Sequence, residues 1–209
     1  SDWSSDVCSS DLVRTKPNSI EPPPLPALRF QTQEPKSVDA SAKVVALQSI
    51  DYDLDGRLDV VALEPDRVVV FGQQETGEWS SLAEAPLAIN ARGMILADLD
   101  RDSKYAGAGL PPLHVADPDL VIFGEKGVVV LKNEVDPATQ QRSLREMAPA
   151  SGVALPNGVT RAVFADLDHD GDLDVVFGAH GGLVLWSNRG DMTFDDISSW
   201  SQLPEAGGR

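Results

Sequence analysis

Three short acidic segments recur along this 209-residue chain, and each stands between runs of apolar residues. The first reads Asp-Tyr-Asp-Leu-Asp-Gly-Arg-Leu-Asp over residues 51–59, and the third reads Asp-Leu-Asp-His-Asp-Gly-Asp-Leu-Asp over residues 166–174. A loop that recurs at one fixed place indicates a repeated structural unit, because every copy must fold in the same local context. The chain is therefore expected to be a repeat protein.

Each acidic segment belongs to a series of four β-rich runs that are separated by turns with Gly or Pro. The predicted strands are 44–49, 58–63, 67–71 and 78–83; 94–97, 120–123, 128–132 and 142–146; and 159–165, 175–178, 183–187 and 193–198. A four-stranded unit of roughly 45 to 55 residues has the size of a β-propeller blade. We predict an all-β fold, a partial β-propeller of about three blades, because the rival β-sandwich would not repeat one loop in every unit.

The repeats predict three regions along the chain. Blades are expected at about 43–88, 89–150 and 151–200, within a repeat region that covers residues 43–209. Residues 13–42 contain six prolines, which block helices and strand pairing, and are predicted to be an extended linker. Residues 1–12 resemble the translated read-through of a sequencing adapter and are expected to be a disordered artefact. That interpretation removes Cys8 from the natural protein and leaves the true N-terminus outside the sequence.

The formal net charge of −16 is concentrated in the acidic segments. They hold 13 of the 33 acidic residues, so that 20 acids face 17 bases elsewhere. Such local acidity points to bound cations. It argues against nucleic acid and anionic membranes, whose phosphates need Lys and Arg. No apolar run exceeds six residues even when glycine is counted as apolar, whereas a membrane-spanning helix needs about 20. A single cysteine excludes a disulfide framework and a Cys-based zinc site.

Carboxylates at positions 1, 3, 5 and 9 of an acidic segment are predicted to surround one Ca²⁺. Gly at position 6 permits a tight turn with positive φ, and position 7 would offer its backbone carbonyl. Calcium accepts 6–8 hard oxygen ligands, whereas Mg²⁺ prefers an octahedron that retains waters. The structural alternative is a solvated acidic hairpin. The predicted ligands are Asp51, Asp53, Asp55, Arg57 and Asp59 in the first segment and Asp166, Asp168, Asp170, Asp172 and Asp174 in the third.

The second segment departs from this pattern. Asp98, Asp100 and Asp102 are in place, but position 6 is serine and the closing Asp119 lies beyond a Gly/Pro-rich insertion, residues 103–118. A site with these four aspartates could form only if the insertion bulges out and lets Asp119 return. The insertion is also a candidate for a specific contact, because loops on a rigid scaffold often carry function.

An EF-hand begins with the same letters but does not fit the rest of the sequence. It needs a bidentate Glu at position 12 and helices on both sides. Position 12 is Ala62 in the first segment and Phe177 in the third, and β-branched residues follow both segments. The segments are therefore predicted to be strand–loop–strand sites.

The motif Asp-x-Asp-x-Asp-Gly-x-x-Asp-Val-Val, followed by Phe177-Gly178 and the turn-containing stretch 185–194, resembles the FG-GAP/VCBS repeat of integrin α-subunits and many bacterial surface proteins. The resemblance covers residues 43–198. It implies a seven-bladed propeller with Ca²⁺ between the first two strands of several blades, in an extracellular, cell-surface or periplasmic location. Residues 147–153 resemble a repeat junction of the cartilage-acidic-protein-like (ASPIC/UnbV) group.

The function that this resemblance implies is a non-catalytic calcium-binding scaffold that displays loops for adhesion to a protein or carbohydrate ligand. The remaining blades of a longer chain would be its other partners. The alternative is a propeller domain of, or accessory to, a secreted polysaccharide-degrading enzyme. Arg189-Gly190-Asp191 spells a tripeptide that integrins recognise, but we interpret it as the turn of the last hairpin. Trp186 and Phe194 are expected to pack between neighbouring sheets.

Overall fold

The computed structural model describes residues 43–101, 117–136, 139, 141–147, 153 and 156–200. All of them lie in the second of the two units into which the chain divides, Asp39–Arg209. The predictions for residues 1–12 and 13–42, for Asp102, for residues 103–116 of the insertion and for most of the junction at 147–153 fall outside the described residues. Among those described, no helix is long and apolar enough to cross a membrane.

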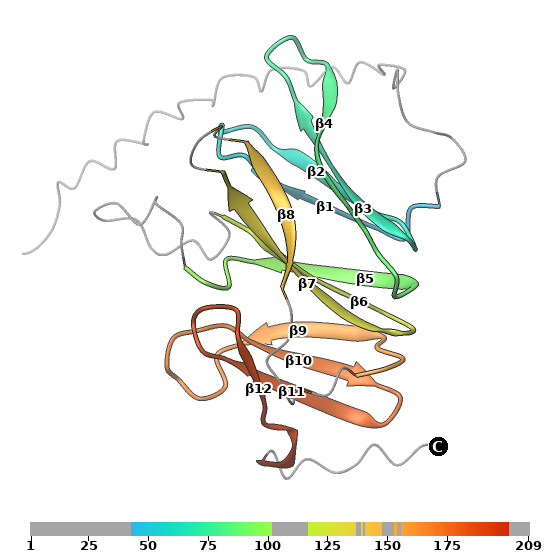
Figure 1. Ribbon diagram of the computed structural model, residues 1–209, viewed down its shortest axis with the longest axis vertical. Coiled ribbons are helices and arrows are strands. Elements are labelled where there is room, and N and C mark those ends of the chain that lie inside the picture. The colour runs from blue at the N-terminus through green and yellow to red at the C-terminus, as the bar shows by residue number, and fades with distance from the viewer. Residues whose placement is uncertain are drawn as a thin grey trace, which may run out of the picture. The chain divides into compact units, whose positions relative to one another are not determined.

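The described residues form three four-stranded antiparallel sheets in which the strands follow their order along the chain (Figure 1). The first sheet contains β1 (Ala46–Ile50), β2 (Asp59–Leu63), β3 (Arg67–Gln73) and β4 (Trp79–Pro86). The second contains β5 (Ala91–Ala97), β6 (Asp119–Gly124), β7 (Gly127–Val135) and β8 (Arg142–Met147). The third contains β9 (Arg161–Ala165), β10 (Asp174–Ala179), β11 (Gly182–Asn188) and β12 (Phe194–Asp196), followed by a short 3₁₀ helix, Ser198–Trp200. All twelve predicted strands and the all-β, blade-like architecture are confirmed.

The first hydrophobic core joins the first and second sheets. Successive residues of a strand point to opposite faces of its sheet, so every second residue of β2 and β3 contributes to this core. It contains Ile50, Val61, Leu63, Val68 and Val70 from the first sheet and Met94, Leu120, Ile122, Val129 and Leu131 from the second.

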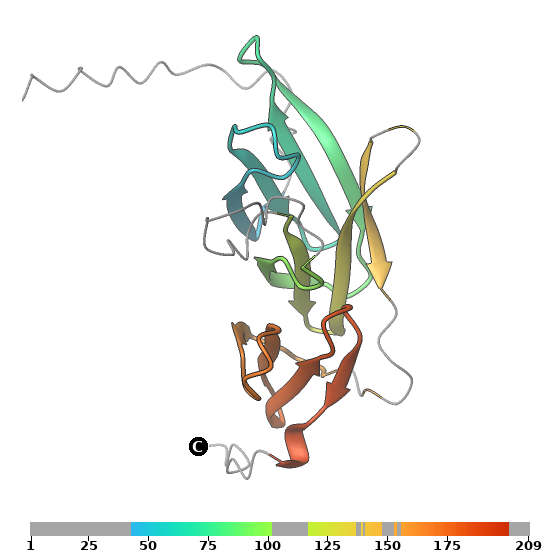
Figure 2. The same cartoon turned by 90° about the vertical axis from the view of Figure 1, so that its left-hand side faces the viewer.

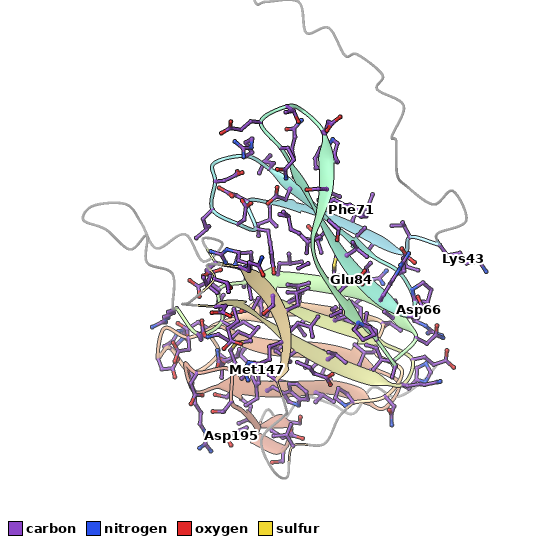
Figure 3. The ribbon with its side chains drawn as sticks, turned by 45° about the horizontal axis from the view of Figure 1, so that its top comes forward. Lys43, Asp66, Phe71, Glu84, Met147 and Asp195 are labelled. Carbon is purple, nitrogen blue, oxygen red and sulfur yellow. The ribbon has the colours of Figure 1, made fainter. Side chains whose placement is uncertain are left out.

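The second core joins the second and third sheets, so the second sheet is covered on both faces. All six residues of β6 are buried, which explains why residues 120–123 of this strand are continuously apolar rather than alternating. Trp186 and Phe194 belong to this core, as predicted, and Met147 at the end of β8 packs against it (Figure 3). The last strands of the first two sheets, β4 and β8, contact each other (Figure 2).

The tripeptide Arg189-Gly190-Asp191 forms the turn between β11 and β12, as predicted. The Arg189 N–H donates to the carbonyl of Thr193 at 3.0 Å, and Gly190 has a φ of 82°. The Arg189 guanidinium makes two hydrogen bonds of 2.6 Å to Asp195, which is labelled in Figure 3. The carboxylate of Asp191 accepts the N–H of Thr193 at 3.0 Å. Both charged side chains of the tripeptide are therefore engaged within their own hairpin.

Candidate metal centres

Three aspartates converge in each of the loops that link the first and second strands of a sheet. We refer to residues 51–59, 98–119 and 166–174 as the first, second and third loop. Within each group, carboxylate oxygens from all three residues lie within 4.8 Å of one another. Ligands on opposite sides of Ca²⁺ are about 5 Å apart at ordinary Ca–O distances, so each group is narrow enough to share one ion. The groups are Asp51, Asp53 and Asp59; Asp98, Asp100 and Asp119; and Asp166, Asp168 and Asp174.

The closing aspartate of each loop is buried and is the first residue of the second strand. We call it position 9 in all three loops, although in the second loop the insertion places Asp119 later in the sequence. In the third loop, Asp174 accepts the N–H of Leu167 at 2.7 Å through Oδ2 and that of Asn188 at 2.9 Å through Oδ1. Asp119 accepts the N–H groups of Leu99 and Asn133 in the same way, at 3.0 and 2.9 Å. This carboxylate therefore ties position 2 of its loop to the end of the third strand.

Residues with positive φ bend the chain in these loops. Gly56 and Gly171 at position 6 have φ values of 86° and 92°, which confirms the predicted turn. Position 4 also lies in the left-handed region in all three loops, at Leu54, Arg101 and His169. This conformation is uncommon for residues other than glycine, and sequence reasoning did not predict it at position 4. In the first loop it lets two successive N–H groups, of residues 55 and 56, donate to the two oxygens of Asp51 at 3.0 Å each.

The side chains at positions 5 and 7 lie outside the groups of three. Asp55 pairs with the guanidinium of Arg57, and Asp170 accepts the N–H of Asp172 at 2.8 Å. The carboxylate of Asp172 lies 3.0 Å from the guanidinium of Arg101, in the loop of the preceding blade. Positions 1, 3 and 9 are therefore brought together, whereas the ligand roles predicted for positions 5 and 7 stay predictions.

The second loop brings its closing aspartate into the group in spite of the insertion. Asp119 pairs across the sheet with Ala97, just as Asp174 pairs with Ala165. The sequence left this return open. Two residues earlier, the buried Asp117 accepts the Nδ2–H of Asn133 at 2.8 Å and pairs with Arg142 at 2.5 Å. Sequence reasoning missed this ion pair, because its partner lies on the fourth strand.

In the first and second loops, burial disfavours the charged form of some of these carboxylates. Desolvation raises the pKa of Asp53, and the neighbouring Asp55 raises it further. Desolvation also raises the pKa of Asp59 against the opposing hydrogen bond from the Tyr52 N–H, and it raises the pKa of Asp119 to about 8. Carboxylates whose charged form is disfavoured by burial gain stability from a nearby cation.

Two buried oxygens in these groups are available for an additional ligand. Among the residues that the structure describes, Asp59 Oδ1 and Asp166 Oδ1 have no partner within hydrogen-bonding distance, although the backbone N–H groups of Gln73 and Asp53 lie near enough to the Asp59 carboxylate to lower its pKa. Asp59 is only 1% exposed, and a buried carboxylate oxygen without a partner is costly. Hard carboxylate oxygens in a narrow cluster are the ligand set that Ca²⁺ prefers. The residues of the first and third loops therefore fit the ion.

The loops also lie at the junctions between blades. The side-chain amide of Asn133 on β7 donates to the carbonyl of Tyr52 in the first loop at 3.3 Å. The equivalent Asn188 on β11 donates to the carbonyl of Leu99 in the second loop at 2.7 Å. Each of these third strands thus binds position 2 of the preceding blade's loop, so a change in loop geometry would reach the next blade.

Comparison with known proteins places one repeat within the chain. Residues 51–104 match the family model described as an FG-GAP-like repeat. The matched region begins at the first acidic loop, runs through β2 to β5 and ends within the second loop. No curated protein matches the sequence significantly.

Proposed function

We propose, from the premise that this chain carries an FG-GAP-like repeat, that it is a non-catalytic β-propeller-like module which binds Ca²⁺ in its first and third loops. The observation that carries the proposal is the convergence of carboxylates at positions 1, 3 and 9, with buried, unpartnered oxygens on Asp59 and Asp166. An ion there would remove carboxylate repulsion and stiffen the loops that hold adjacent blades together. Its role is structural, coupled to folding by mass action.

Calorimetric titration of Ca²⁺ into chelator-treated protein tests this proposal. We expect two sites per chain with dissociation constants of about 10⁻⁴ to 10⁻³ M, the range of extracellular modules. Asp53→Asn and Asp168→Asn should each remove one site, because each deletes a carboxylate charge from one group. Asp66→Asn is the matched control, since Asp66 is exposed in the turn after β2 and belongs to no group (Figure 3). Absence of binding heat in the wild type would contradict the proposal.

Acidification should weaken Ca²⁺ binding at the first loop at an unusually high pH. Metal binding requires the deprotonated carboxylates, and burial raises the pKa of both Asp53 and Asp59. The affinity should therefore rise with pH and fall before the pH drops to about 4, where an ordinary aspartate titrates. Titrations of the Asp168→Asn variant between pH 7.5 and 5 would isolate the first loop. An affinity that stays constant across this range would contradict the assignment.

A module of this kind suits a compartment in which Ca²⁺ is abundant. Sites with dissociation constants near 10⁻³ M fill only at millimolar Ca²⁺, which favours an extracellular, cell-surface or periplasmic location. A rigid scaffold there would present its loops to a protein or carbohydrate ligand in adhesion. The residues 103–118 interrupt the second loop and are the segment best placed by sequence for such a contact.

The outer face of the third sheet is proposed to take a further blade. Val163, Val176, Leu183 and Leu185 share this face, and Val163 and Leu183 are 57% and 47% exposed. The same register positions in the second sheet are occupied by Ile95, Val121, Val128 and Val130, all of which lie in or against the second core. In the second sheet this face is covered by the third sheet. By the same arrangement, the equivalent face of the third sheet would be covered by a further neighbouring sheet.

The chain expressed alone should therefore self-associate. Its exposed apolar face would be buried by contact with a second copy of the chain, because exposed apolar patches promote association. Val163→Lys should shift the population toward monomer, because a charged side chain would be desolvated in the contact. Thr76→Lys, in the exposed β3–β4 turn, adds the same charge elsewhere and should change nothing. Light scattering during size-exclusion chromatography measures this, and a concentration-independent wild-type monomer would contradict it.

A further inference from the structure

One position on the third strand contacts the acidic loop in the second and third blades. It stands thirteen residues after the aspartate at position 9 and is occupied by Gly72, Lys132 and Ser187 in the three blades. Lys132 and Ser187 directly precede Asn133 and Asn188, whose N–H groups bind the aspartate at position 9. The three residues are therefore structurally equivalent, although their side chains differ in length and charge.

The side chain at this position reaches the aspartate at position 3. The Ser187 hydroxyl donates to Asp168 Oδ2 at 3.3 Å. The Lys132 ammonium forms an ion pair with Asp100 Oδ2, and the two side chains are only 17% and 10% exposed. Gly72 places no side chain beside the first loop. Among the described residues, only the second loop has a positively charged side chain from the third strand of its own sheet beside its carboxylates.

We propose that the Lys132 ammonium is the built-in cation of the second loop, so that the second blade does without Ca²⁺. This inference rests on the proposed function of the first and third loops. The ammonium is compact and sits on a flexible four-carbon stem, which allows it to enter a cluster that would otherwise hold a metal ion. It neutralises one carboxylate charge and excludes a second cation from the same place by repulsion.

The sequence of the second loop agrees with this assignment. Position 6 is serine instead of glycine, and the insertion separates position 6 from Asp119. Burial raises the pKa of Asp119, while the charge of Lys132 opposes that rise. A covalently attached cation holds the cluster together at any Ca²⁺ concentration, which keeps the middle blade formed when the outer loops are empty.

The test compares wild type with Lys132→Ser, which places at this position the residue type found in the third blade. We would measure the number of Ca²⁺ ions bound per chain and the melting temperature in the presence of a chelator. Wild type should bind two ions per chain and Lys132→Ser three. In chelator, Lys132→Ser should melt several degrees below wild type, and Ca²⁺ should restore most of that loss. Lys126→Ser is the matched control, because Lys126 is exposed in the β6–β7 turn. It removes the same charge and should leave both stoichiometry and melting temperature unchanged.

A second variant covers the case in which Lys132→Ser does not fold. Asp100→Asn should keep two ions per chain, whereas it would lose one if the second loop held Ca²⁺. Three ions in the wild type, or a loss of one in Asp100→Asn, would overturn the inference. Two ions in Lys132→Ser with wild-type stability in chelator would overturn it too. Absence of any Ca²⁺ binding would overturn the proposed function instead, and the stability of Lys132→Ser against Lys126→Ser would then decide the role of the lysine.

Discussion

Asp174→Ala is expected to lower the free energy of unfolding in saturating Ca²⁺ by about 3–5 kcal/mol. The substitution leaves two buried N–H donors without an acceptor and removes one ligand of the proposed ion. Asp174 is fully buried and accepts the N–H groups of Leu167 and Asn188 at 2.7 and 2.9 Å. Hydrogen bonds to a charged group contribute about 1.5–3 kcal/mol each. The third loop should also lose its Ca²⁺ site, since this residue supplies one of three convergent carboxylates.

The loss should be smaller in chelator than in Ca²⁺. Without the ion, Asp174 is repelled by Asp166 and Asp168 in the same group, so its removal also relieves repulsion. Urea unfolding with and without Ca²⁺ measures the difference. Asp172→Ala is the matched control within the same loop, because its carboxylate pairs with the half-exposed Arg101 and exposed pairs contribute about 0–1 kcal/mol. Equal losses for the two variants would contradict the role of Asp174.

The strands could be predicted because local sequence rules determine most of them. Apolar β-branched runs such as Val68–Val70 stand between Gly- or Pro-containing turns, and each becomes a strand. The predictions placed several boundaries too early or too late, as in β4, which extends to Pro86 instead of ending at Ala83. The extension depends on pairing with β3, in which Arg67 lies opposite Pro86 and Val68 opposite Ala85. Such pairing is a tertiary property that the local pattern does not contain.

The aspartate groups could be predicted in part. Positions 1, 3 and 9 converge because the hairpin between the first two strands is closed by the aspartate at position 9, and that spacing is written in the sequence. Position 5 lies outside the group in the first loop, where Asp55 pairs with Arg57, and its predicted ligand role stays a prediction. The positive φ of Leu54 and Arg101 could not be predicted, because neither leucine nor arginine favours it, and the enrichment of histidine there is too weak to have predicted it at His169.

The contacts between blades were beyond sequence reasoning for a different reason. Asn188 and Leu99 are 89 residues apart, and Asn133 and Tyr52 are 81 apart. Only the stacking of successive sheets brings them together. The insertion in the second loop has little effect on strand pairing, because the entropic cost of closing a loop grows slowly with its length. The pairing of Ala97 with Asp119 therefore survives an excursion that the sequence alone left undecided.

Trp186→Ala is expected to lower the free energy of unfolding by about 3–5 kcal/mol, the range for removing a large aromatic side chain from a core. Trp186 is 1% exposed in the core between the second and third sheets. Its ring contacts Phe177 edge-on at a centroid distance of 4.9 Å and Phe194 at 5.6 Å. Chemical denaturation measures the loss, and Trp79→Ala is the control, because Trp79 is 43% exposed.

Trp186→Phe should be much milder, and the comparison separates packing from hydrogen bonding. Among the described residues, the buried Trp186 Nε1 has no hydrogen-bond partner, so phenylalanine sacrifices volume but no hydrogen bond. Trp186 is also two residues before Asn188, whose N–H binds Asp174. A cavity at Trp186 should therefore loosen the third loop and weaken its Ca²⁺ binding, and by linkage Ca²⁺ should then stabilise Trp186→Ala less than wild type. Equal Ca²⁺ affinity in Trp186→Ala and wild type would show that the core and the loop are energetically independent.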